Sequence, residues 1–590
     1  MCGIFGYIGP SCEAAGLVFN SLKELEYRGY DSWGIALDRN GHVETVKDVG
    51  KLVAAPSGMG DSGLAIGHTR WATTGAVTHD NAHPHSDCTG RLALVHNGIV
   101  ENYVELKAGL LARGHLFNSE TDSEVIAHLI EEQLAADPKL GLTEALRRVS
   151  LLLHGMNAVV VMDSLRDEMA AVKNGSPLVI GLNGGSNYLA SDIAALLKHT
   201  RKIIWVRDGQ VAGVRKDGVT LLDAATGASV VPQVEEITWD AQQAELGPYQ
   251  HYLEKEIWEQ PGLIRQIVGE GGEQAAQLAG FLSTASDIYF TGCGTAYHAG
   301  LMGTYVLAQV ADRMAHTIYA HELPNFTPFL HEQQAVVALS QSGETIDVLD
   351  AVRAAHASAV PVAALVNVPG STLSREADLT LLLGAGPEKC VLSTKAFTAK
   401  VAYLMLAAGV IGGREAEVHA ALSEAAAEMD AMRADGRIDV VRALAERIQH
   451  SEHLFVVGRG ACYPLALEAA LKVKEVSYIH AEGFASGELK HGVIALVEKG
   501  TPCIVFAPSG PDEAQALTTA GELRARGALV VGVGPQSHPV FDVHLRVDAS
   551  GHAFPLAALP PVQLLAYNLA LLRGLDPDKP RNLAKSVTVR

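Results

Sequence analysis

A cysteine directly after the initiator is the residue of this chain whose position most clearly suggests chemistry. If Met1 is removed, Cys2 carries both a thiol and a free α-amine. Only a small fraction of a free thiol is ionised at neutral pH, but an amine in the same residue can take its proton. Cys2 could therefore be a nucleophile that carries its own base. The alternative is that a cysteine at position 2 is accidental.

Polar motifs downstream of Cys2 could supply the other groups that an amide-hydrolysing site needs. Each motif has an ordinary alternative, because an Arg beside a Trp can be a stacked surface pair and Asn-Gly can be a hairpin turn. Their occurrence together, behind Cys2, favours a site. The motifs are Tyr27-Arg-Gly-Tyr-Asp-Ser32, Gly67-His-Thr-Arg-Trp-Ala-Thr73, Asn81-Ala-His-Pro-His85, His96-Asn-Gly98 and Thr121-Asp122.

The second half of the chain contains an internal duplication. Ile288-Tyr-Phe-Thr-Gly292-Cys-Gly294 matches Leu454-Phe-Val-Val-Gly458-Arg-Gly460, and in each copy an apolar strand runs into Gly-x-Gly and a helix. Units of this kind build doubly wound parallel sheets, which bind ligands at the carboxyl ends of their strands. The sequence therefore predicts two related α/β domains.

The loop after the next strand differs between the two copies. Ser340-Gln-Ser-Gly-Glu-Thr345 offers hydroxyls, an amide and a glycine at an expected helix amino terminus, which suits phosphate. Its counterpart is Ala507-Pro-Ser-Gly-Pro-Asp512, in which two prolines remove N–H donors and Asp512 repels anions. We expect phosphate to bind in the first copy only.

Length, charge and cysteine usage limit the class of protein. The 590 residues require several domains, and 46 Lys and Arg against 66 Asp and Glu disfavour nucleic acid or an anionic membrane surface as partners. Seven scattered cysteines without a Cys-x-x-Cys pair indicate a reducing compartment, so a cytoplasmic location is expected. The longest apolar stretch, residues 553–572, is interrupted by prolines and predicts a buried helix rather than a membrane span.

The amino-terminal motifs resemble, closely and in order, those of the class II glutamine amidotransferases, whose nucleophile is an amino-terminal cysteine. The resemblance implies an α+β, Ntn-type, four-layer αββα glutaminase domain. It also implies that Arg70 binds the α-carboxylate of L-glutamine, Asp122 binds its α-ammonium, and the Asn97 side chain with the Gly98 N–H forms an oxyanion hole. A guanidinium fork suits a carboxylate, and neutral donors suit a tetrahedral oxyanion.

Two further residues of the same motif join the expected substrate-binding set, namely Trp71 and Thr73. Trp71 is large enough to close a passage through which ammonia could travel without meeting water. The chain departs from the family pattern at Thr74, where relatives commonly carry His, and at Trp33, where a small residue is usual.

The second half resembles the paired sugar isomerase (SIS) domains of the glutamine:fructose-6-phosphate aminotransferases, and the match extends over nearly the whole chain. The resemblance implies two α/β SIS domains with parallel sheets. It assigns a sugar-site role to Thr295 and phosphate binding to Ser340, Gln341, Ser342 and Thr345. The most specific stretches are 340–345, 391–398, 471–482, 487–492 and 580–589.

Conversion of a 2-keto sugar into a 2-amino aldose requires a ring opener, a carbonyl activator and a base. His491 suits ring opening because imidazole exchanges protons near neutral pH. Glu475 suits transfer of a proton from C1 to C2, and Lys472 lies one turn earlier on the same helix face. Lys585 is the candidate for a Schiff base with the C2 ketone. In the family, the histidine that matches His491 comes from a neighbouring subunit, which implies a homodimer.

Two of these assignments have ordinary alternatives. Lys472 and Glu475 could form a solvated salt bridge on a helix surface, and a lysine near a carboxyl terminus is usually a mobile surface charge. The tail around Lys585 is apolar and β-branched, which favours a packed segment.

The complete prediction is a cytoplasmic enzyme that converts D-fructose 6-phosphate and L-glutamine into D-glucosamine 6-phosphate and L-glutamate, with no metal and no cofactor. One rival is another Cys2 amidotransferase, such as a purine-pathway transferase or asparagine synthetase. A second rival is a sugar-phosphate sensor without chemistry. The expected domains are a glutaminase domain (1–215), a linker (216–250), a first SIS domain (251–430), a second SIS domain (431–575) and a tail that contributes to the sugar site (576–590).

Overall fold

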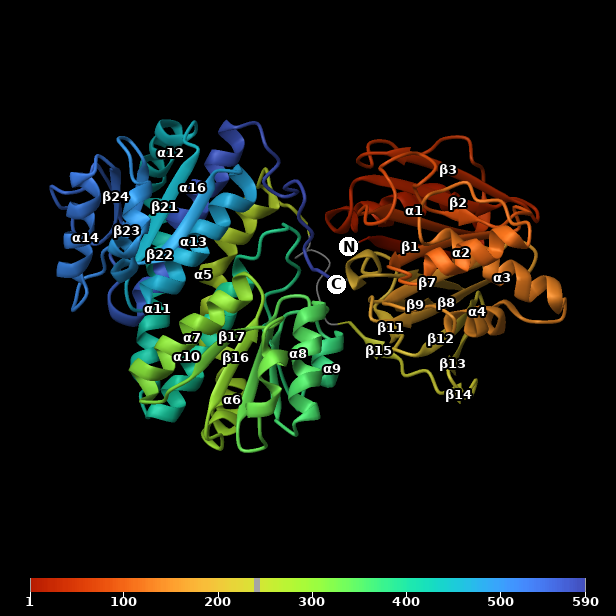
Figure 1. The fold of residues 1–590 in the computed structure, drawn as a ribbon, viewed down its shortest axis with the longest axis horizontal. Helices are drawn as coiled ribbons and strands as arrows, with labels where there is room; N and C mark the ends of the chain where they lie inside the picture. The colour runs from red at the N-terminus through yellow and green to blue at the C-terminus, as the bar shows by residue number, and fades with distance from the viewer. Residues whose placement is uncertain (1, 238–244, 589–590) are drawn as a thin grey trace. The chain divides into compact units, whose positions relative to one another are not determined.

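The computed structural model describes residues 2–237 and 245–588, and the chain divides into two compact units. The first unit comprises residues up to Glu245 together with the tail from Ala584. The second comprises Leu246–Leu583. Figure 1 shows β-sheets with flanking helices in both units, which are described separately below.

The first unit contains two antiparallel sheets, of eight and seven strands among the described residues. In spatial order the first sheet consists of β15 (Glu235–Glu236), β11 (Lys202–Trp205), β9 (Val179–Asn183), β10 (Ser186–Ala190), β1 (Gly3–Cys12), β4 (Ser62–Arg70), β2 (Ser32–Asp38) and β3 (Val43–Val49). The second consists of β14 (Ser229–Val230), β13 (Gly218–Asp223), β12 (Gln210–Arg215), β8 (Glu168–Asn174), β7 (Asn157–Asp163), β6 (Leu92–Gly98) and β5 (His85–Ser86).

The two sheets are stacked, and helices cover their outer faces. Along β1, Phe5 and Tyr7 pack with helix α1 (Ala14–Lys23), whereas Ile4 and Ile8 pack against the second sheet. This alternation follows from the two-residue period of a strand. Helices α3 (Glu124–Ala136) and α4 (Leu142–Ser150) cover the other side of the second sheet, and α2 (Tyr103–Ala112) packs beside α3. The expected four-layer αββα fold is confirmed.

The segment expected as a linker is partly folded into these sheets. Arg215 pairs with Gly218, so Lys216 and Asp217 form the tight turn of a hairpin between β12 and β13. Strands β14 and β15 extend the edges of the two sheets up to Glu236. The Asp-Gly pair that looked like a domain boundary is thus a hairpin signal within the first unit. Residues 238–244, also within the expected linker, lie outside the described residues.

The second unit contains two parallel sheets of five strands each, with the same strand order. One consists of β17 (His316–Tyr319), β16 (Ile288–Gly292), β18 (Ala335–Ser340), β19 (Val362–Val366) and β20 (Leu379–Leu382). The other consists of β22 (His480–Ala485), β21 (His453–Gly458), β23 (Pro502–Phe506), β24 (Leu529–Gly534) and β25 (Val543–Arg546). The duplication predicted from the sequence is confirmed.

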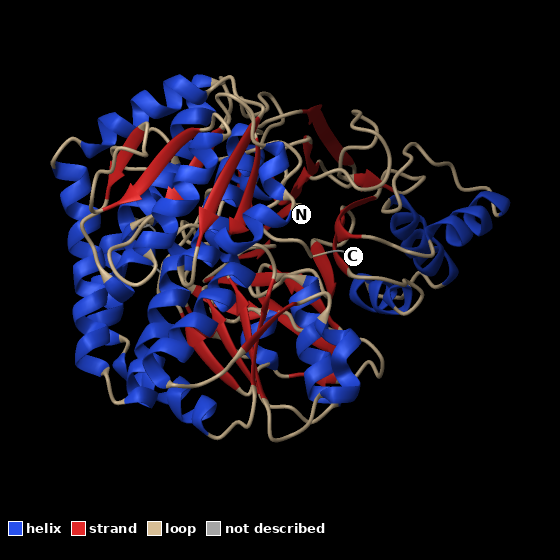
Figure 2. Cartoon of the chain, turned by 60° about the vertical axis from the view of Figure 1, so that its left-hand side comes forward, coloured by secondary structure: helices blue, strands red, loops and turns tan. Residues whose placement is uncertain are grey.

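Helices lie on both faces of each parallel sheet (Figure 2). One continuous core joins the facing sides of the two sheets, because helices from both copies contribute to it. The helices of this unit are α5 (Tyr252–Glu270), α6 (Gly272–Ser283), α7 (Thr295–Ala311), α8 (Ile346–Ala357), α9 (Thr372–Glu376), α10 (Lys395–Gly412), α11 (Glu415–Ala434), α12 (Arg437–Ile448), α13 (Cys462–Ser477), α14 (Glu513–Ala525), α15 (Phe554–Ala557) and α16 (Leu559–Leu572).

Two segments among the described residues, Lys395–Gly412 and Gly551–Leu572, are long and apolar enough to cross a membrane by length and composition. In each, 83% of the most apolar 18-residue window is buried inside the protein. Both contribute side chains to the core shared by the two parallel sheets. They therefore pack as core helices, as the proline-interrupted stretch 553–572 predicted.

Candidate active sites

Cys2 lies at the start of β1, beside the end of β4. The pairing of Gly3 with Thr69 brings Cys2 next to Arg70 and Trp71. Glycine is required at position 3, because a Cβ there would lie 2.5 Å from the Thr69 hydroxyl. The Cys2 Sγ accepts a hydrogen bond from the Trp71 N–H at 3.1 Å. The sheet register therefore places the thiol beside the two residues that the sequence assigned to glutamine binding.

Burial raises the pKa of the Cys2 thiol above its ordinary value, although the Trp71 N–H and the Arg70 charge act in the opposite direction. The resting group is consequently a thiol, and a base must remove its proton before it can attack an amide. An α-amine on Cys2 itself would meet this requirement.

Asn97, at the end of β6, reaches the nucleophile through its side-chain amide. Its Nδ2 donates to the Cys2 carbonyl oxygen at 2.9 Å. The next residue, Gly98, has a φ of +133°, and a Cβ there would lie 1.9 Å from the Met156 carbonyl oxygen. Only glycine therefore fits the bend after Asn97. The two expected oxyanion donors lie on adjacent residues beside Cys2.

His68 fixes the orientation of the Asn97 amide, and sequence reasoning did not select it. Its Nε2 lies 3.1 Å from both the Asn97 Oδ1 and the His96 carbonyl oxygen. Burial lowers the pKa of His68 to about 3, so the ring is neutral and Nε2 carries its single proton. Asn97 Oδ1 must then accept, which directs Nδ2 toward Cys2. The available signal was a histidine on a buried strand two residues before Arg70.

The two residues expected to bind the ends of glutamine are both buried. Arg70 donates to the carbonyl oxygens of Thr74, at 2.6 Å, and of Gly75 and Ala76, each at 3.1 Å. Asp122 accepts from the Val100 N–H at 2.7 Å. Arg70 is thus held by the loop that follows it, and Thr74 contributes a main-chain oxygen that does not depend on side-chain identity.

The remaining positions of this site differ in burial. Trp71 is half-buried and meets the Tyr30 ring edge-on at 5.7 Å, whereas Thr73 is exposed. Trp33, the second departure from the family pattern, is a core residue that packs edge-on against Phe19 at 5.5 Å. Its size is used in packing beneath α1 and not at the thiol.

The expected phosphate loop connects β18 to α8 in the first copy. Ser340 Oγ accepts from the Gly343 N–H at 2.9 Å, and Ser342 Oγ accepts from the Glu344 N–H at 3.2 Å. Gly343 has a φ of +70°, and a Cβ there would lie 2.1 Å from the Ser371 hydroxyl oxygen. The loop is therefore a tight turn at the amino terminus of a helix of 12 residues, where the helix dipole favours an anion.

Other residues of the loop support this turn. The Glu344 carboxylate accepts from the N–H and the hydroxyl of Thr372, each at 2.8 Å. The Gln341 Oε1 is buried without a hydrogen-bond partner among the described residues. Thr345 is the residue that precedes the first turn of α8. The N–H groups of Gly343 and Glu344 already donate to serine hydroxyls and are less available to a phosphate. Hydroxyl donors would therefore contribute more to phosphate binding than the sequence suggested.

A buried cluster of charges joins α7 of the first copy to α13 of the second. Lys472 Nζ lies 2.7 Å from Glu475 Oε2 and 3.4 Å from Glu468 Oε1, and it donates to the Thr295 hydroxyl at 3.0 Å. Its side chain is 1% exposed, whereas that of Glu475 is 19% exposed. The pair is therefore not a solvated helix salt bridge, and Glu475 is the member nearest to solvent.

Glu468 anchors the cluster and was missed from the sequence. It is fully buried and accepts from Thr295 Oγ1 at 3.1 Å and from His298 Nδ1 at 2.8 Å. Although burial opposes charge, Glu468 and Glu475 together raise the pKa of Lys472, and Lys472 and His298 lower the pKa of Glu468. Both groups are ionised. A carboxylate four residues before Lys472, flanked by apolar residues of the same helix, was the signal.

The last two predicted residues lie outside this cluster. His491 is the final residue of a short 3₁₀ helix, Ser486–His491, and is exposed. Lys585 is half-buried in the tail that belongs to the first unit, and Ser586 and Thr588 beside it are buried. The structure thus brings Thr295, Lys472 and Glu475 together in the second unit. Lys585, in contrast, belongs to the first unit.

Comparisons with known proteins agree with this arrangement. A glutamine amidotransferase domain family matches residues 68–198, and the SIS domain family matches residues 281–409 and 447–573. The glutamine–fructose-6-phosphate aminotransferases (isomerizing) of Pyrococcus horikoshii and Thermus thermophilus are 41% identical over 602 residues and 42% identical over 612 residues. In both, the alignment covers 100% of this chain and of the relative.

A solved structure also matches the second unit. The carboxyl-terminal domain of the glucosamine-fructose-6-phosphate aminotransferase from Francisella tularensis is 31% identical, with a TM-score of 0.53. It covers 57% of this chain and 100% of that domain. The full-length alignments, the amidotransferase domain and the two SIS domains together show that the chain belongs to the glutamine–fructose-6-phosphate aminotransferase (isomerizing) family.

Proposed function

We propose that this protein transfers the amide nitrogen of L-glutamine to D-fructose 6-phosphate and releases D-glucosamine 6-phosphate and L-glutamate. The observation that carries the proposal is the presence of two separate clusters of polar side chains in one chain. Cys2 has an amide donor, Asn97, directed at its backbone, and a parallel-sheet unit holds the buried Lys472 beside Glu475. Full-length relatives that carry this name support the same reaction.

In the first half-reaction, the Cys2 α-amine takes the thiol proton and the sulfur attacks the glutamine amide carbon. Asn97 Nδ2 and the Gly98 N–H stabilise the negative oxygen, a contribution commonly worth ~10²–10³ in rate per donor. Collapse transfers the proton to the leaving nitrogen and releases ammonia, and water then hydrolyses the thioester to glutamate. Arg70 holds the α-carboxylate and Asp122 the α-ammonium, which leaves the amide at the sulfur. Trp71 and Thr73 complete the glutamine-binding set.

In the second half-reaction, His491 of a second copy opens the sugar ring, which makes a homodimer the working unit. Lys585 forms a Schiff base with the C2 ketone and releases water, and ammonia then displaces the lysine amine. Glu475 removes a proton from C1 and returns one to C2, while the C1 hydroxyl loses its proton and the imine nitrogen gains one, so that the 2-imine becomes the 2-amino aldose. Lys472 and Thr295 position Glu475 and the sugar oxygens.

The phosphate of the ketose is bound by Ser340, Gln341, Ser342 and Thr345 at the amino terminus of α8. The tight turn at Gly343, at the amino terminus of a 12-residue helix, supports this assignment. Ammonia must reach the sugar before water protonates it, so we also propose an enclosed passage gated by Trp71. The chemistry uses side chains and the amino terminus alone, and the enzyme acts in the cytoplasm.

One assay distinguishes this function from its rivals. The full chain is incubated with glutamine and fructose 6-phosphate, and glutamate and amino sugar are both quantified. We expect equal amounts of the two products, loss of both in Cys2→Ala, and retention of both in Cys12→Ala, which is the matched cysteine control. Glutamate without amino sugar would favour another amidotransferase, and binding of the ketose without turnover would favour a sensor.

A further inference from the structure

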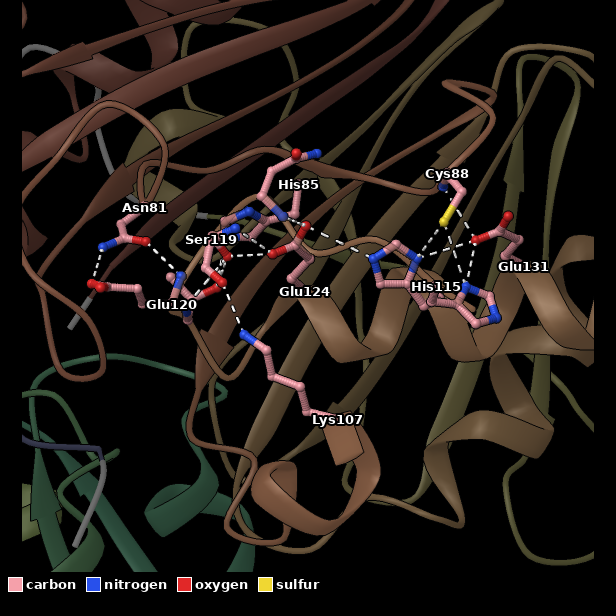
Figure 3. A network of polar contacts seen from close by, with 12 residues as sticks. Asn81, His85, Cys88, Lys107, His115, Ser119, Glu120, Glu124 and Glu131 are labelled. Atoms are coloured by element: carbon pink, nitrogen blue, oxygen red, sulfur yellow. Dashed lines mark hydrogen bonds and ion pairs between the residues drawn. The ribbon is translucent and has the colours of Figure 1, made fainter. Parts of the chain in front are cut away.

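Four metal-ligand side chains converge in the first unit, away from the residues that the proposed reaction uses. Cys88 follows β5, His115 follows α2, and His128 and Glu131 lie one turn apart on α3. One ligand atom from each residue lies within 4.8 Å of the other three. Figure 3 shows the labelled Cys88, His115 and Glu131 pointing toward one another.

The separations between these atoms match the edges of a tetrahedral coordination shell. Cys88 Sγ lies 3.6 Å from His115 Nδ1 and 3.5 Å from His128 Nδ1. Glu131 Oε2 lies 3.2 Å from His115 Nδ1 and 3.1 Å from His128 Nδ1. Tetrahedral bonds to zinc of about 2.3 Å for sulfur and 2.0–2.2 Å for nitrogen or oxygen separate neighbouring ligands by roughly 3.4–3.6 Å. These four separations therefore lie within a few tenths of an ångström of tetrahedral values, and the remaining two are below 4.8 Å.

A second ring of carboxylates stands behind the two histidines. His115 Nε2 lies 3.2 Å from Glu132 Oε1, and His128 Nε2 faces Glu124 Oε1 at 3.8 Å. A carboxylate at Nε2 keeps the proton on that nitrogen, which leaves the Nδ1 lone pair for a metal ion. The side chains of His128, His115 and Glu131 are 1%, 12% and 16% exposed. Three of the four side chains are therefore largely shielded from solvent, whereas Cys88 is exposed.

We propose that Cys88, His115, His128 and Glu131 form a tetrahedral site for a single zinc ion. The donor set of one thiolate, two imidazoles and one carboxylate suits a borderline-soft divalent cation. On binding, the Cys88 thiol releases its proton to solvent, and the thiolate and carboxylate together neutralise the two positive charges. A proton on His115 Nε2 can be donated to Glu132 at 3.2 Å, whereas His128 Nε2 only faces the negative charge of Glu124 at 3.8 Å.

The ion would connect three segments that the chain otherwise holds by packing and hydrogen bonds. It would tie the loop after β5 and the loop after α2 to helix α3. Asp122, the residue proposed to bind the glutamine ammonium, lies two positions before the first residue of α3. The site therefore has a structural role, in which the ion stabilises the first unit and the segment that carries Asp122, and it takes no part in the chemistry at Cys2.

Cobalt titration of the full chain tests the proposal. The chain is first dialysed against a chelator, and Co²⁺ is then added while the visible and near-ultraviolet absorption is recorded. We expect one equivalent to produce the intense visible bands of tetrahedral Co²⁺ together with a thiolate-to-metal charge-transfer band, and one equivalent of Zn²⁺ to abolish both. Absence of saturable binding, or octahedral bands without charge transfer, would overturn the proposal.

Variants assign the bands to these residues. Cys88→Ser should lose the charge-transfer band, and His128→Gln should weaken Co²⁺ binding by more than the ~10–100-fold typical of changes behind the ligands. Glu132→Gln should fall within that range. Cys2→Ala and Cys12→Ser should keep the full spectrum, since each removes a cysteine outside the site. If Cys2→Ala removes the band and Cys88→Ser keeps it, the ion belongs at the nucleophile and the proposal fails. Melting temperatures without metal verify that each variant is folded.

Discussion

The two copies of the duplicated parallel-sheet domain share a strand order but carry different polar groups. The loop after β18 contains Ser340, Ser342 and the positive-φ Gly343, and it leads directly into α8. The loop after β23 contains Pro508 and Pro511 instead. There Asp512 forms an ion pair with Arg459 at 3.1 Å, and its negative charge would repel a phosphate. The two copies therefore share a scaffold, but only the first keeps the loop that we propose as the phosphate site.

The helices that follow the first strand of each copy also differ, but here the second copy carries the charged residues. An offset of 166 residues aligns Gly292 with Gly458, and it aligns α7 with α13. The buried Glu468 and Lys472 of α13 then correspond to Met302 and Val306 of α7, and Glu475 corresponds to the exposed Gln309. These differences are consistent with the proposed division of labour, in which the first copy binds the phosphate and the second supplies the charged groups for proton transfer.

The largest effect is expected at Glu475, where the comparison predicts that chemistry depends on the second copy alone. Glu475→Gln keeps the side-chain shape but removes the base, so amino-sugar formation should fall by ~10²–10⁴-fold while glutamine hydrolysis continues. The matched change in the first copy, Gln309→Glu, should leave both rates unchanged. Separate assays of glutamate and glucosamine 6-phosphate measure the two activities, and equal losses in the two variants would contradict the division of labour.

A second large effect concerns the stability of the buried charges. Lys472→Met leaves Glu468 charged and buried opposite a neutral side chain, which should lower the free energy of unfolding of the second unit by about 3–5 kcal/mol. Val306→Met, at the equivalent position of the first copy, adds volume to an apolar environment and should cost about 1–3 kcal/mol at most. Urea denaturation of both variants gives the two values. Equal destabilisation would show that Lys472 acts only by filling space.

An intermediate effect is expected at the glycines of the two loops. Gly343→Ala places a methyl group 2.1 Å from the Ser371 hydroxyl oxygen at a φ of +70°, whereas at Gly510, with a φ of +129°, an added Cβ has no atom of the described chain within 4 Å. Both changes strain the backbone by about 1–3 kcal/mol. Only Gly343→Ala should also raise the KM for fructose 6-phosphate, by roughly tenfold or more, which corresponds to about 1.4 kcal/mol. Steady-state kinetics at saturating glutamine provide the measurement, and a similar KM for both variants would exclude the first loop as the phosphate site.

The sequence predicted those features that follow from local patterns. The repeated Gly-x-Gly units predicted both parallel sheets, and the motifs downstream of Cys2 predicted Arg70 and Asn97, which the structure places beside it. Contacts between segments that are far apart in the sequence could not be predicted from local patterns. His68 and Glu468 act through the Asn97 amide and Lys472, and their importance appears only when β4 meets β6 and α7 meets α13. The hairpin at Lys216–Asp217 was taken for a linker, because polar turn residues occur in both settings.

The smallest effect is expected from the ion pair that replaced the second anion site. Arg459 and Asp512 are 43% and 42% exposed, so Asp512→Asn should change stability by only about 0.2–1 kcal/mol. The change also removes the repelling charge, but Pro508 and Pro511 still deprive that loop of two N–H donors. Calorimetric titration with fructose 6-phosphate should therefore give the same single site per chain before and after the substitution. Appearance of a second site would mean that charge alone, and not the lost backbone donors, abolished phosphate binding in the second copy.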